Sequence, residues 1–546
     1  MDPLSLGRAA VEQRAWEQAC THLVAADDQG ALQDAEDLLR LGLSAHLTRK
    51  DEVAEVAWER AYEAFADRGD VLAAARCAFW LGLVLLLAHG ADARGGGWLA
   101  RAQRALEEGA PQECAERGYL LLPAGLRALD RGDPAGAHHA FAEATTAGRR
   151  FRDADLATLG CLGQGQALIR GGAAARGLAH LDEAMVAVQA GRVSPVASGI
   201  VYCAVVLACQ EVLDLRRAQQ WTAALTGWCD AQPGLIPFRG QCLVHRAELA
   251  QWRGDWAEAV AEAERACHWL SDPPDLAAGT AYYRLAELHR VRGEQAAGEA
   301  AFQQAVVLGH DPQPGLALLR LAQGRTQTAV ASIRCALDRP AAGVVDGVRA
   351  PRSRAELLAA GVEILLAAGD TGAAGAACLE LDGIARTVGT SAMRATAARA
   401  RGAVSLAEGR YAAALGDLSD ALARWSALVA PYEAARTRVL VGHALRGLGD
   451  EDTAAMELTT ARRVFETVGA GPDLERLGAP PPAAGLTPRE LDVVRLVAEG
   501  CTNREIAARL VISDKTVARH LHNVFTKLAL PNRSAATAYA YEHHLV

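Results

Sequence analysis

The chain has 546 residues, of which 51% are hydrophobic and only 5% aromatic, and its formal net charge is −9. This length allows several domains or one long repeat array. No apolar run reaches the roughly 18 residues of a membrane span, and the longest candidate is Leu81–Ala88. No basic segment followed by an apolar one opens the chain, so neither a signal peptide nor a membrane anchor is expected.

The twelve cysteines are scattered and include no Cys-x-x-Cys pair. Many lie inside apolar helical patterns, which favours small core residues in a reducing compartment over a redox or metal role. Examples are Cys77, Cys161, Cys203 and Cys378. The pairs His138-His139 and His543-His544 lack partners at metal-ligand spacing and are interpreted as solvated helix surface. We therefore expect a cytoplasmic protein without a metal or cofactor.

Glycine-containing turns recur through most of the chain, in most cases about 40 residues apart. One interval is double, and its missing turn is expected near Leu213-Asp214. A register follows each glycine, with a small residue five positions later, an apolar one at nine, and a small or apolar one at twelve. These spacings of four and three place each set on one helical face. The glycines are Gly132, Gly172, Gly254, Gly293, Gly324, Gly369, Gly409 and Gly449.

This register resembles the second helix of a tetratricopeptide repeat, most closely at Gly254-Asp255-Trp256-x-x-Ala259 and Gly409-Arg410-Tyr411-x-x-Ala414. The same register without the glycine appears at Ala19/Leu23/Ala26 and Ala54/Trp58/Ala61. Gly95-Gly96-Gly97 interrupts it and is interpreted as a loop insertion. About twelve hairpins fit. The resemblance implies a helical solenoid whose inner surface is the usual site for a ligand or partner, of unknown identity here.

Enzymatic chemistry finds no support in the sequence. The three lysines of the chain are Lys50, Lys515 and Lys527. None stands in a Gly-x-x-x-x-Gly-Lys-Ser/Thr loop, so a nucleotide-hydrolysing domain is excluded. The sequence shows no alternation of strand and helix patterns of the kind that forms a phospho-acceptor domain. We therefore expect no catalytic residues and no enzyme.

A proline-rich stretch, residues 479–485, separates the repeats from the C-terminal end. Pro480-Pro481-Pro482 cannot continue a helix and is expected to act as a semi-rigid spacer. The predicted organisation is a repeat domain at 1–478, a linker at 479–485 and a small helical domain at 486–546.

The C-terminal end has the signals of a helix-turn-helix unit. Thr487 with Glu490, and Thr502 with Glu505, are capping boxes, and Ser513 caps a third helix. That third helix has an apolar row and a polar row at the same spacings of four, three and four. The apolar row is Val517, Leu521, Val524 and Leu528, and the polar row is Lys515, Arg519, His522 and Thr526.

These residues resemble the LuxR-type (NarL/GerE-like) DNA-binding domain. The resemblance rests on Leu486-Thr487-x-Arg489-Glu490, Asn503-x-Glu505-Ile506-Ala507, Ser513-x-x-Thr516-Val517-x-x-His520 and Lys527-Leu528 with Arg533. It implies a four-helix module that binds double-stranded DNA as a homodimer, with a helix-turn-helix from Thr502 to Leu521. It also implies base-reading positions at Ala518, Arg519 and His522, and DNA-backbone contacts from Asn503, Ser513, Lys515, Thr516 and Lys527.

The charge distribution agrees with DNA contact confined to this end. Residues 486–546 hold eight Lys or Arg against six Asp or Glu, whereas the upstream chain holds 48 against 59. The sequence thus predicts an all-α protein, a tetratricopeptide-like solenoid followed by a LuxR-type domain. Its expected function is sequence-specific transcriptional regulation under the control of the repeats. The alternative is a repeat scaffold that docks partners and retains a vestigial DNA-binding domain.

Overall fold

The structure is a computed structural model that describes residues 2–89, 92–232, 234, 235, 239–272, 275, 277–339, 351–478, 486–528, 530–542 and 545. Over these residues the regular structure is entirely helical, from α1 to α30, which confirms the predicted fold class. The chain forms two compact units. Unit 1 comprises Met1–Arg290 and Glu294–Ala397, and unit 2 comprises Val291–Gly293 and Ala398–Val546. The predicted linker at 479–485 lies outside the described residues, as does the pair His543-His544.

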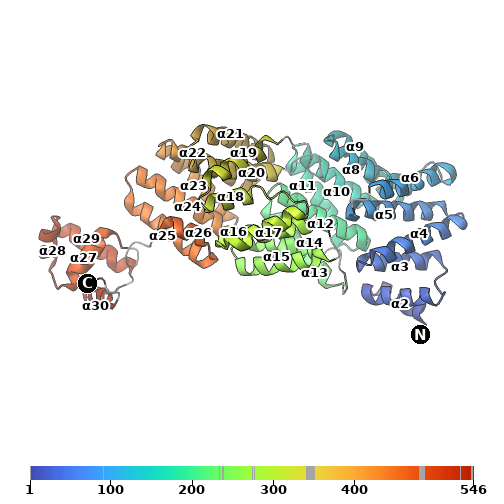
Figure 1. The fold of residues 1–546 in the computed structure, drawn as a ribbon, viewed down its shortest axis with the longest axis horizontal. Helices are drawn as coiled ribbons and strands as arrows, with labels where there is room; N and C mark the ends of the chain where they lie inside the picture. The colour runs from blue at the N-terminus through green and yellow to red at the C-terminus, as the bar shows by residue number, and fades with distance from the viewer. Residues whose placement is uncertain are drawn as a thin grey trace. The chain divides into compact units, whose positions relative to one another are not determined.

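Consecutive helices of unit 1 pair as hairpins, as in tetratricopeptide repeats (Figure 1). Its first helices are α1 (Pro3–Glu12), α2 (Trp16–Asp28), α3 (Ala35–Leu47), α4 (Asp51–Asp67), α5 (Val71–His89), α6 (Asp92–Gly109), α7 (Ala115–Tyr119) and α8 (Leu121–Asp130). The next are α9 (Pro134–Phe151), α10 (Ala154–Arg170), α11 (Ala174–Gln189), α12 (Pro195–Glu211), α13 (Leu215–Asp230), α14 (Arg239–Arg253) and α15 (Trp256–Ser271).

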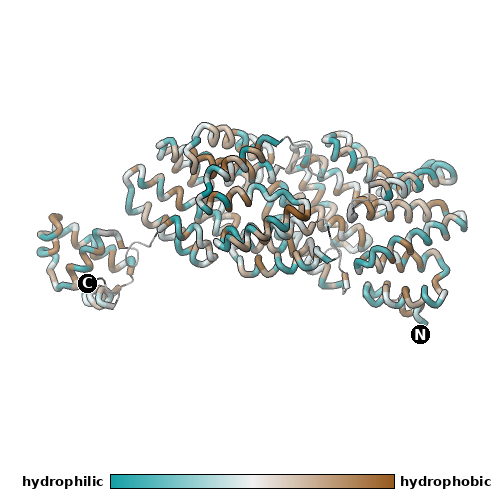
Figure 2. Tube along the Cα trace, in the orientation of Figure 1, coloured by the Kyte–Doolittle hydropathy of each residue, from teal (hydrophilic) through white to brown (hydrophobic). Residues whose placement is uncertain are grey.

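The array continues with the same pairing of neighbours. These helices are α16 (Ala278–Arg292), α17 (Gln295–Val307), α18 (Gly315–Ala322), α19 (Thr326–Asp338), α20 (Pro351–Ala367), α21 (Thr371–Val388) and α22 (Ser391–Ala407). In unit 2 they are followed by α23 (Tyr411–Ala427), α24 (Pro431–Gly447), α25 (Glu451–Val468) and α26 (Gly471–Leu477). Hydrophilic and hydrophobic residues alternate along most of these helices (Figure 2), as amphipathic packing requires.

The turns between hairpin helices follow the glycine pattern of the sequence. All eight glycines of the pattern adopt positive φ, between 74° at Gly132 and 86° at Gly254 and Gly293. Only glycine reaches this left-handed region without a steric penalty, which explains its recurrence. The turn expected near Leu213-Asp214 is also confirmed, because Leu213 has φ 53° and Asp214 caps α13.

The register after each glycine marks the buried face of the second helix. In α15, Ala259, Ala263 and Ala266 are all fully buried, and small side chains here let the neighbouring helix approach. The same holds for Ala19, Leu23 and Ala26 in α2, where no glycine precedes the helix. Among the residues five, nine and twelve positions after the eight pattern glycines, Leu458 of α25 is half-buried and the others are buried. The predicted helix faces are therefore confirmed.

The prediction of a loop at Gly95-Gly96-Gly97 was wrong, because all three glycines lie inside α6. Helix α6 packs on α5, and a β-carbon at Gly95 would lie 2.9 Å from the carbonyl oxygen of Gly82. A glycine here serves close helix packing rather than a turn. In the sequence alone, a run of three glycines indicates a break in a helix. Its role in close packing between helices becomes visible only with the neighbouring helix in place.

Unit 1 also contains contacts between segments far apart in the sequence. The indole nitrogen of Trp16 on α2 donates to Gln232, which follows α13, at 3.1 Å. The Thr390 hydroxyl donates to the carbonyl oxygen of Val212 at 2.6 Å. Each bond links hairpins separated by several repeats, so distant as well as adjacent repeats are in contact within unit 1.

All twelve cysteines lie in the described part of the chain, and none forms a disulfide. Cys335 is exposed and the other eleven are buried, as expected for small core residues. No helix within the described ranges is both long enough and apolar enough to cross a bilayer.

Candidate nucleic-acid interface

The C-terminal domain contains α27 (Pro488–Ala498), α28 (Asn503–Leu510), α29 (Asp514–Lys527) and α30 (Arg533–Glu542). Both predicted capping boxes are formed. The Thr487 hydroxyl accepts from the Glu490 amide at 3.2 Å, and the Glu490 carboxylate accepts from the Thr487 amide at 2.8 Å. Thr502 and Glu505 make the equivalent pair before α28. Two donors at each helix start are thereby satisfied, which fixes where α27 and α28 begin.

A tight turn joins α28 to α29. Val511 adopts φ 55°, and the residue is 89% exposed. The Ser513 hydroxyl then caps α29 by accepting from the Thr516 amide at 3.1 Å. A short helix, a left-handed turn and a longer capped helix form the helix-turn-helix expected from Thr502 to Leu521. Helix α29 itself continues beyond that span to Lys527.

The apolar row of α29 holds it against the rest of the domain. Val517, Leu521 and Val524 are at most 6% exposed, and Leu528 is half-buried. They join two small hydrophobic clusters with residues of α27, α28 and α30. Burial of this row determines which face of α29 remains in solvent.

The opposite face of α29 carries the predicted base-reading residues. Ala518, Arg519 and His522 are exposed, as is Lys515 one turn before Arg519. None of these side chains makes a hydrogen bond or ion pair with any residue that the structure describes. The structure thus brings all four together on one solvent-facing surface, with the side-chain donors of Lys515, Arg519 and His522 available.

The other predicted contact residues are engaged inside the domain. The side-chain oxygen of Asn503 accepts from the Arg533 guanidinium at 2.8 Å. The Ser513 and Thr516 hydroxyls lie 2.7 Å apart. Lys527 Nζ lies 2.7 Å from the Glu490 carboxylate, whose side chain is only 3% exposed. Lys527 therefore ties the end of α29 to the start of α27, a pairing across 37 residues that no local pattern indicates.

The basic residues of this domain divide into two groups. Five of the eight bond within it, through carboxylates, an amide oxygen or main-chain carbonyls: Arg489, Arg495, Arg509, Lys527 and Arg533. Arg504, Lys515 and Arg519 are exposed and have no such partner in the described ranges. Arg504, near the start of α28, was missed from the sequence. Its lack of an intramolecular partner is visible only in three dimensions.

Comparisons with known proteins concentrate on this domain. The family model described as bacterial regulatory proteins, luxR family, matches residues 484–540. The transcriptional regulatory protein LiaR of Bacillus subtilis is 46% identical over 65 residues, or 12% of this chain and 31% of LiaR. The putative HTH-type transcriptional regulator Rv0890c of Mycobacterium tuberculosis is 56% identical over 55 residues, or 10% of this chain and 6% of that protein. The chain thus spans less than a third of either relative.

The repeat region has a weaker structural likeness. The crystal structure of the APC/C hetero-tetramer Cut9-Hcn1 aligns with 87% of this chain and 95% of that one, at a TM-score of 0.34 and 12% identity. The hairpin pairing and turn register described above, rather than this likeness, define the repeats. At the other end, the helix order, the capping boxes and the match to residues 484–540 identify the C-terminal helix-turn-helix as a domain of the luxR family of bacterial regulatory proteins.

Proposed function

We propose that this protein is a sequence-specific DNA-binding transcriptional regulator whose helical repeats act as a sensor, partner-binding or oligomerisation module. The observation that carries the proposal is that three basic side chains of the helix-turn-helix are exposed, namely Arg504 on α28 and Lys515 and Arg519 on α29. Cations without an intramolecular partner, on a helix of major-groove size, are suited to a polyanion. The matched relatives are named as regulators of transcription, which supports the same function.

On the exposed face of α29 we assign base readout to Ala518, Arg519 and His522. The guanidinium of Arg519 can donate two hydrogen bonds to the O6 and N7 atoms of a guanine, whereas Ala518 offers apolar contact to a thymine methyl. Arg519 therefore carries most of the hydrogen-bonding specificity in this proposal. His522, one turn further along α29, extends the contact to a neighbouring base pair.

Phosphate contacts are assigned to residues around the start of α28 and α29. Lys515 and Arg504 supply charge, and Asn503, Ser513 and Thr516 supply neutral polar groups close to helix N-termini, where backbone dipoles also favour an anion. The amide nitrogen of Asn503 remains a donor while its oxygen binds Arg533. Lys527 stays a predicted phosphate contact, in competition with its ion pair to Glu490.

The domain is proposed to bind as a homodimer. Eight basic against six acidic residues give this domain a net charge of only +2, so a single copy neutralises few phosphates. Two copies double that contribution and read two half-sites, about one helical turn or 34 Å apart. In this proposal, the repeats control DNA binding by setting how the two copies of the C-terminal domain are positioned for DNA.

Selection of DNA by the full-length protein tests the proposal. A random duplex pool should yield one enriched motif with two half-sites, with and without cell extract to supply an effector. The matched control changes Arg504, Lys515 and Arg519 to Ala, and this variant should enrich nothing. If wild type enriches no sequence in either arm, or the triple variant enriches the same motif, the regulator hypothesis fails and the scaffold alternative stands.

A further inference from the structure

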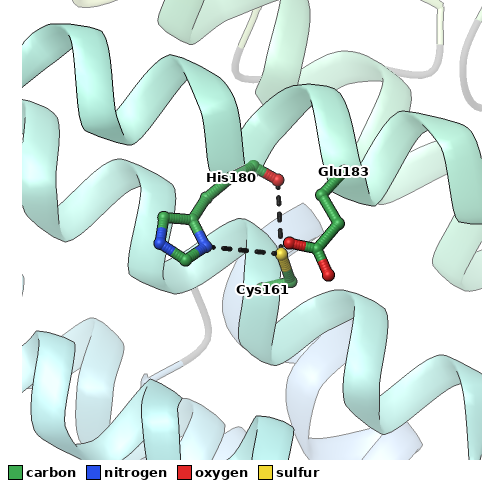
Figure 3. A group of neighbouring side chains, drawn as sticks. All are labelled: Cys161, His180 and Glu183. Atoms are coloured by element: carbon green, nitrogen blue, oxygen red, sulfur yellow. Dashed lines mark hydrogen bonds between the residues drawn. The ribbon is translucent and has the colours of Figure 1, made fainter.

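Three side chains of metal-ligand type meet where α10 packs on α11 (Figure 3). Cys161 comes from α10, and His180 and Glu183 come from α11. Cys161 Sγ lies 3.7 Å from His180 Nδ1. One ligand atom from each of the three residues lies within 4.8 Å of the others, the one such group among the residues that the structure describes.

Local packing explains why these side chains meet. Helices α10 and α11 approach so closely that a β-carbon at Gly177 would lie 2.5 Å from the carbonyl oxygen of Gly165. This contact brings the short side chain of Cys161 within reach of the opposite helix. His180 and Glu183 are three residues apart and share one face of α11. The ligands come from two helices, so the sequence spacing gave no metal motif.

We propose that Cys161, His180 and Glu183 bind a divalent transition-metal ion of the Zn²⁺ class. Thiolate, imidazole and carboxylate are the side-chain ligands that zinc uses in proteins. Tetrahedral coordination at about 2.0–2.3 Å places neighbouring ligand atoms about 3.3–3.8 Å apart. The 3.7 Å separation of Cys161 Sγ and His180 Nδ1 fits this geometry. Three protein ligands leave the fourth position to water or a small ligand.

The groups have other partners that the metal must replace. The Cys161 thiol donates to the carbonyl oxygen of His180 at 3.2 Å, and burial raises the pKa of this thiol to about 12. Binding therefore forms a metal–sulfur bond and releases the thiol proton to solvent. Arg149 on α9 pairs with the Glu183 carboxylate at 2.7 Å and competes for it.

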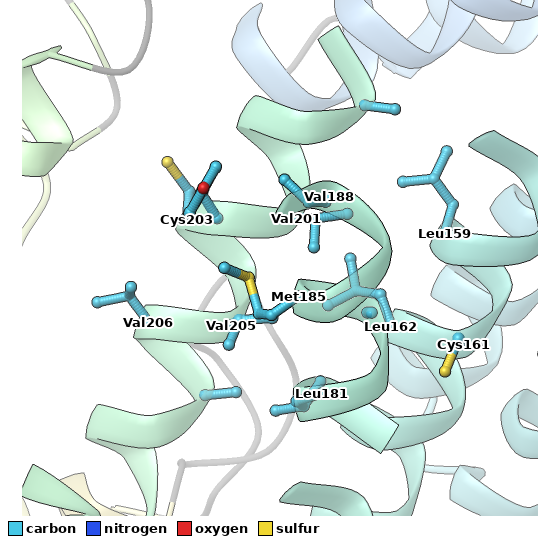
Figure 4. Close-up of a cluster of buried hydrophobic side chains, with 14 of the residues drawn as sticks. Leu159, Cys161, Leu162, Leu181, Met185, Val188, Val201, Cys203, Val205 and Val206 are labelled. Atoms are coloured by element: carbon cyan, nitrogen blue, oxygen red, sulfur yellow. The ribbon is translucent and has the colours of Figure 1, made fainter. Parts of the chain in front are cut away.

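The proposed ligands extend from the core of the hairpin to its surface. Cys161 belongs with Leu162 and Leu181 to a large hydrophobic cluster of unit 1 (Figure 4), whereas Glu183 is exposed. On the adjacent α9, the charge of His180 helps to lower the pKa of His138, after burial, so a second imidazole is near the three proposed ligands. A bound ion would link the two helices of the hairpin and stabilise it. This proposal concerns the repeats alone and does not rest on DNA binding.

Titration of the full-length protein with Co²⁺ tests the site, because a cobalt–thiolate bond gives a charge-transfer absorption band. We expect one equivalent of Co²⁺ to produce the band and Zn²⁺ to displace it. Cys161→Ser should abolish the band. His180→Ala should weaken binding by at least about 100-fold, the upper end of what loss of an outer-shell partner costs. Two controls should match wild type: Cys335→Ser at the exposed cysteine and His139→Ala beside the neighbouring helix face.

The role of Glu183 has its own readout. Arg149→Ala frees the carboxylate and should tighten Co²⁺ binding, and Glu183→Gln should weaken it. Unchanged affinity in both variants would overturn the assignment of Glu183 as a ligand. The whole proposal is overturned if wild type shows no thiolate band at millimolar Co²⁺, or if the band persists in His180→Ala with wild-type affinity. Circular dichroism checks folding, and His180, which is only partly buried, decides the matter if Cys161→Ser does not fold.

Discussion

Many arginines of the repeats differ from two arginines of the C-terminal domain in whether they have a partner within the chain. In the repeats, many guanidinium groups reach a carboxylate 33 to 37 residues away, which is about one repeat along the chain. Examples are Arg60 with Asp27, Arg68 with Asp34, Arg150 with Glu113, Arg217 with Asp182 and Arg399 with Glu433. In the C-terminal domain, Arg504 and Arg519 reach no partner in the part of the chain that the structure describes.

Arginines with a carboxylate partner contribute to the fold, whereas arginines without one are available to bind a ligand. An exposed pair between repeats contributes about 0–1 kcal/mol and connects one hairpin to the next. An unpaired cation on a helix face contributes little to stability and retains its full interaction with a phosphate or a base. The distinction makes separate predictions for the two regions.

The largest effect is expected at a buried charge cluster of unit 1. Glu248 on α14 is 3% exposed and pairs with Arg284 of α16 and Arg352 of α20. Glu248→Gln removes the carboxylate that Arg284 and Arg352 share and leaves Arg352 with Glu356 alone, so it should lower the free energy of unfolding by about 3 kcal/mol, the lower end for breaking a buried pair. Denaturant unfolding measures this, with the exposed Glu258→Gln as control. Equal stability of both variants would show that the cluster is not needed for folding.

The same carboxylate predicts a pH dependence. Burial alone would raise the pKa of Glu248, but Arg284 and Arg352 outweigh it and lower the pKa from 4.5 to about 2. A depressed pKa stabilises the folded state above the unfolded value, and this contribution is lost as the pH falls. Wild-type stability should therefore decline between about pH 4.5 and pH 2, and Glu248→Gln should show a flatter profile there. Parallel profiles would contradict this assignment.

The next effect tests the repeat register. Ala259 on α15 is fully buried, and Ala259→Phe should destabilise the protein by about 1–3 kcal/mol through overpacking. Ala257→Phe, on the exposed face of the same helix, is the matched control and should leave thermal unfolding nearly unchanged. Similar melting of the two variants would mean that the buried face of α15 is assigned incorrectly.

A smaller effect distinguishes the two C-terminal lysines. Lys527→Ala removes the partner of buried Glu490 and should cost about 1 kcal/mol of stability, since Lys527 is itself partly exposed. An ion pair with Glu490 that persists on DNA should leave the salt dependence of DNA binding by this variant near that of wild type. A drop of about one unit in the salt slope at unchanged stability would instead support the phosphate contact predicted for Lys527.

Lys515→Ala should show the reverse behaviour and the smallest effect on folding. Lys515 is exposed at the start of α29, and no described residue pairs with it. The variant should melt like wild type while its salt slope falls by about one unit per bound domain, equally on all sequences. Binding measured at several salt concentrations on specific and scrambled duplexes checks this. An unchanged slope would exclude Lys515 from the phosphate contacts.

Local signals made much of the fold predictable. The capping boxes at Thr487 and Thr502, the glycine turns and the buried face of α15 all depend on residues within a few positions of each other. Long-range structure was not predictable in this way. The ion pair of Lys527 with Glu490 and the bond from Trp16 to Gln232 join distant segments. At the candidate interface, the sequence identified Arg519. It did not identify Arg504, because only the structure shows which basic residues already have partners within the domain.

The most direct test of the central claim is the binding free energy of Arg519→Ala on a selected duplex and on a scrambled one. Arg519 lies on the exposed face of α29, so its loss should cost about 1–3 kcal/mol on the selected site and little on scrambled DNA. Arg509→Ala, whose guanidinium pairs with Glu499 at 2.6 Å, is the control and should change neither affinity appreciably. Equal loss on both duplexes for Arg519→Ala would contradict the account, because it would make this residue a backbone contact without sequence readout.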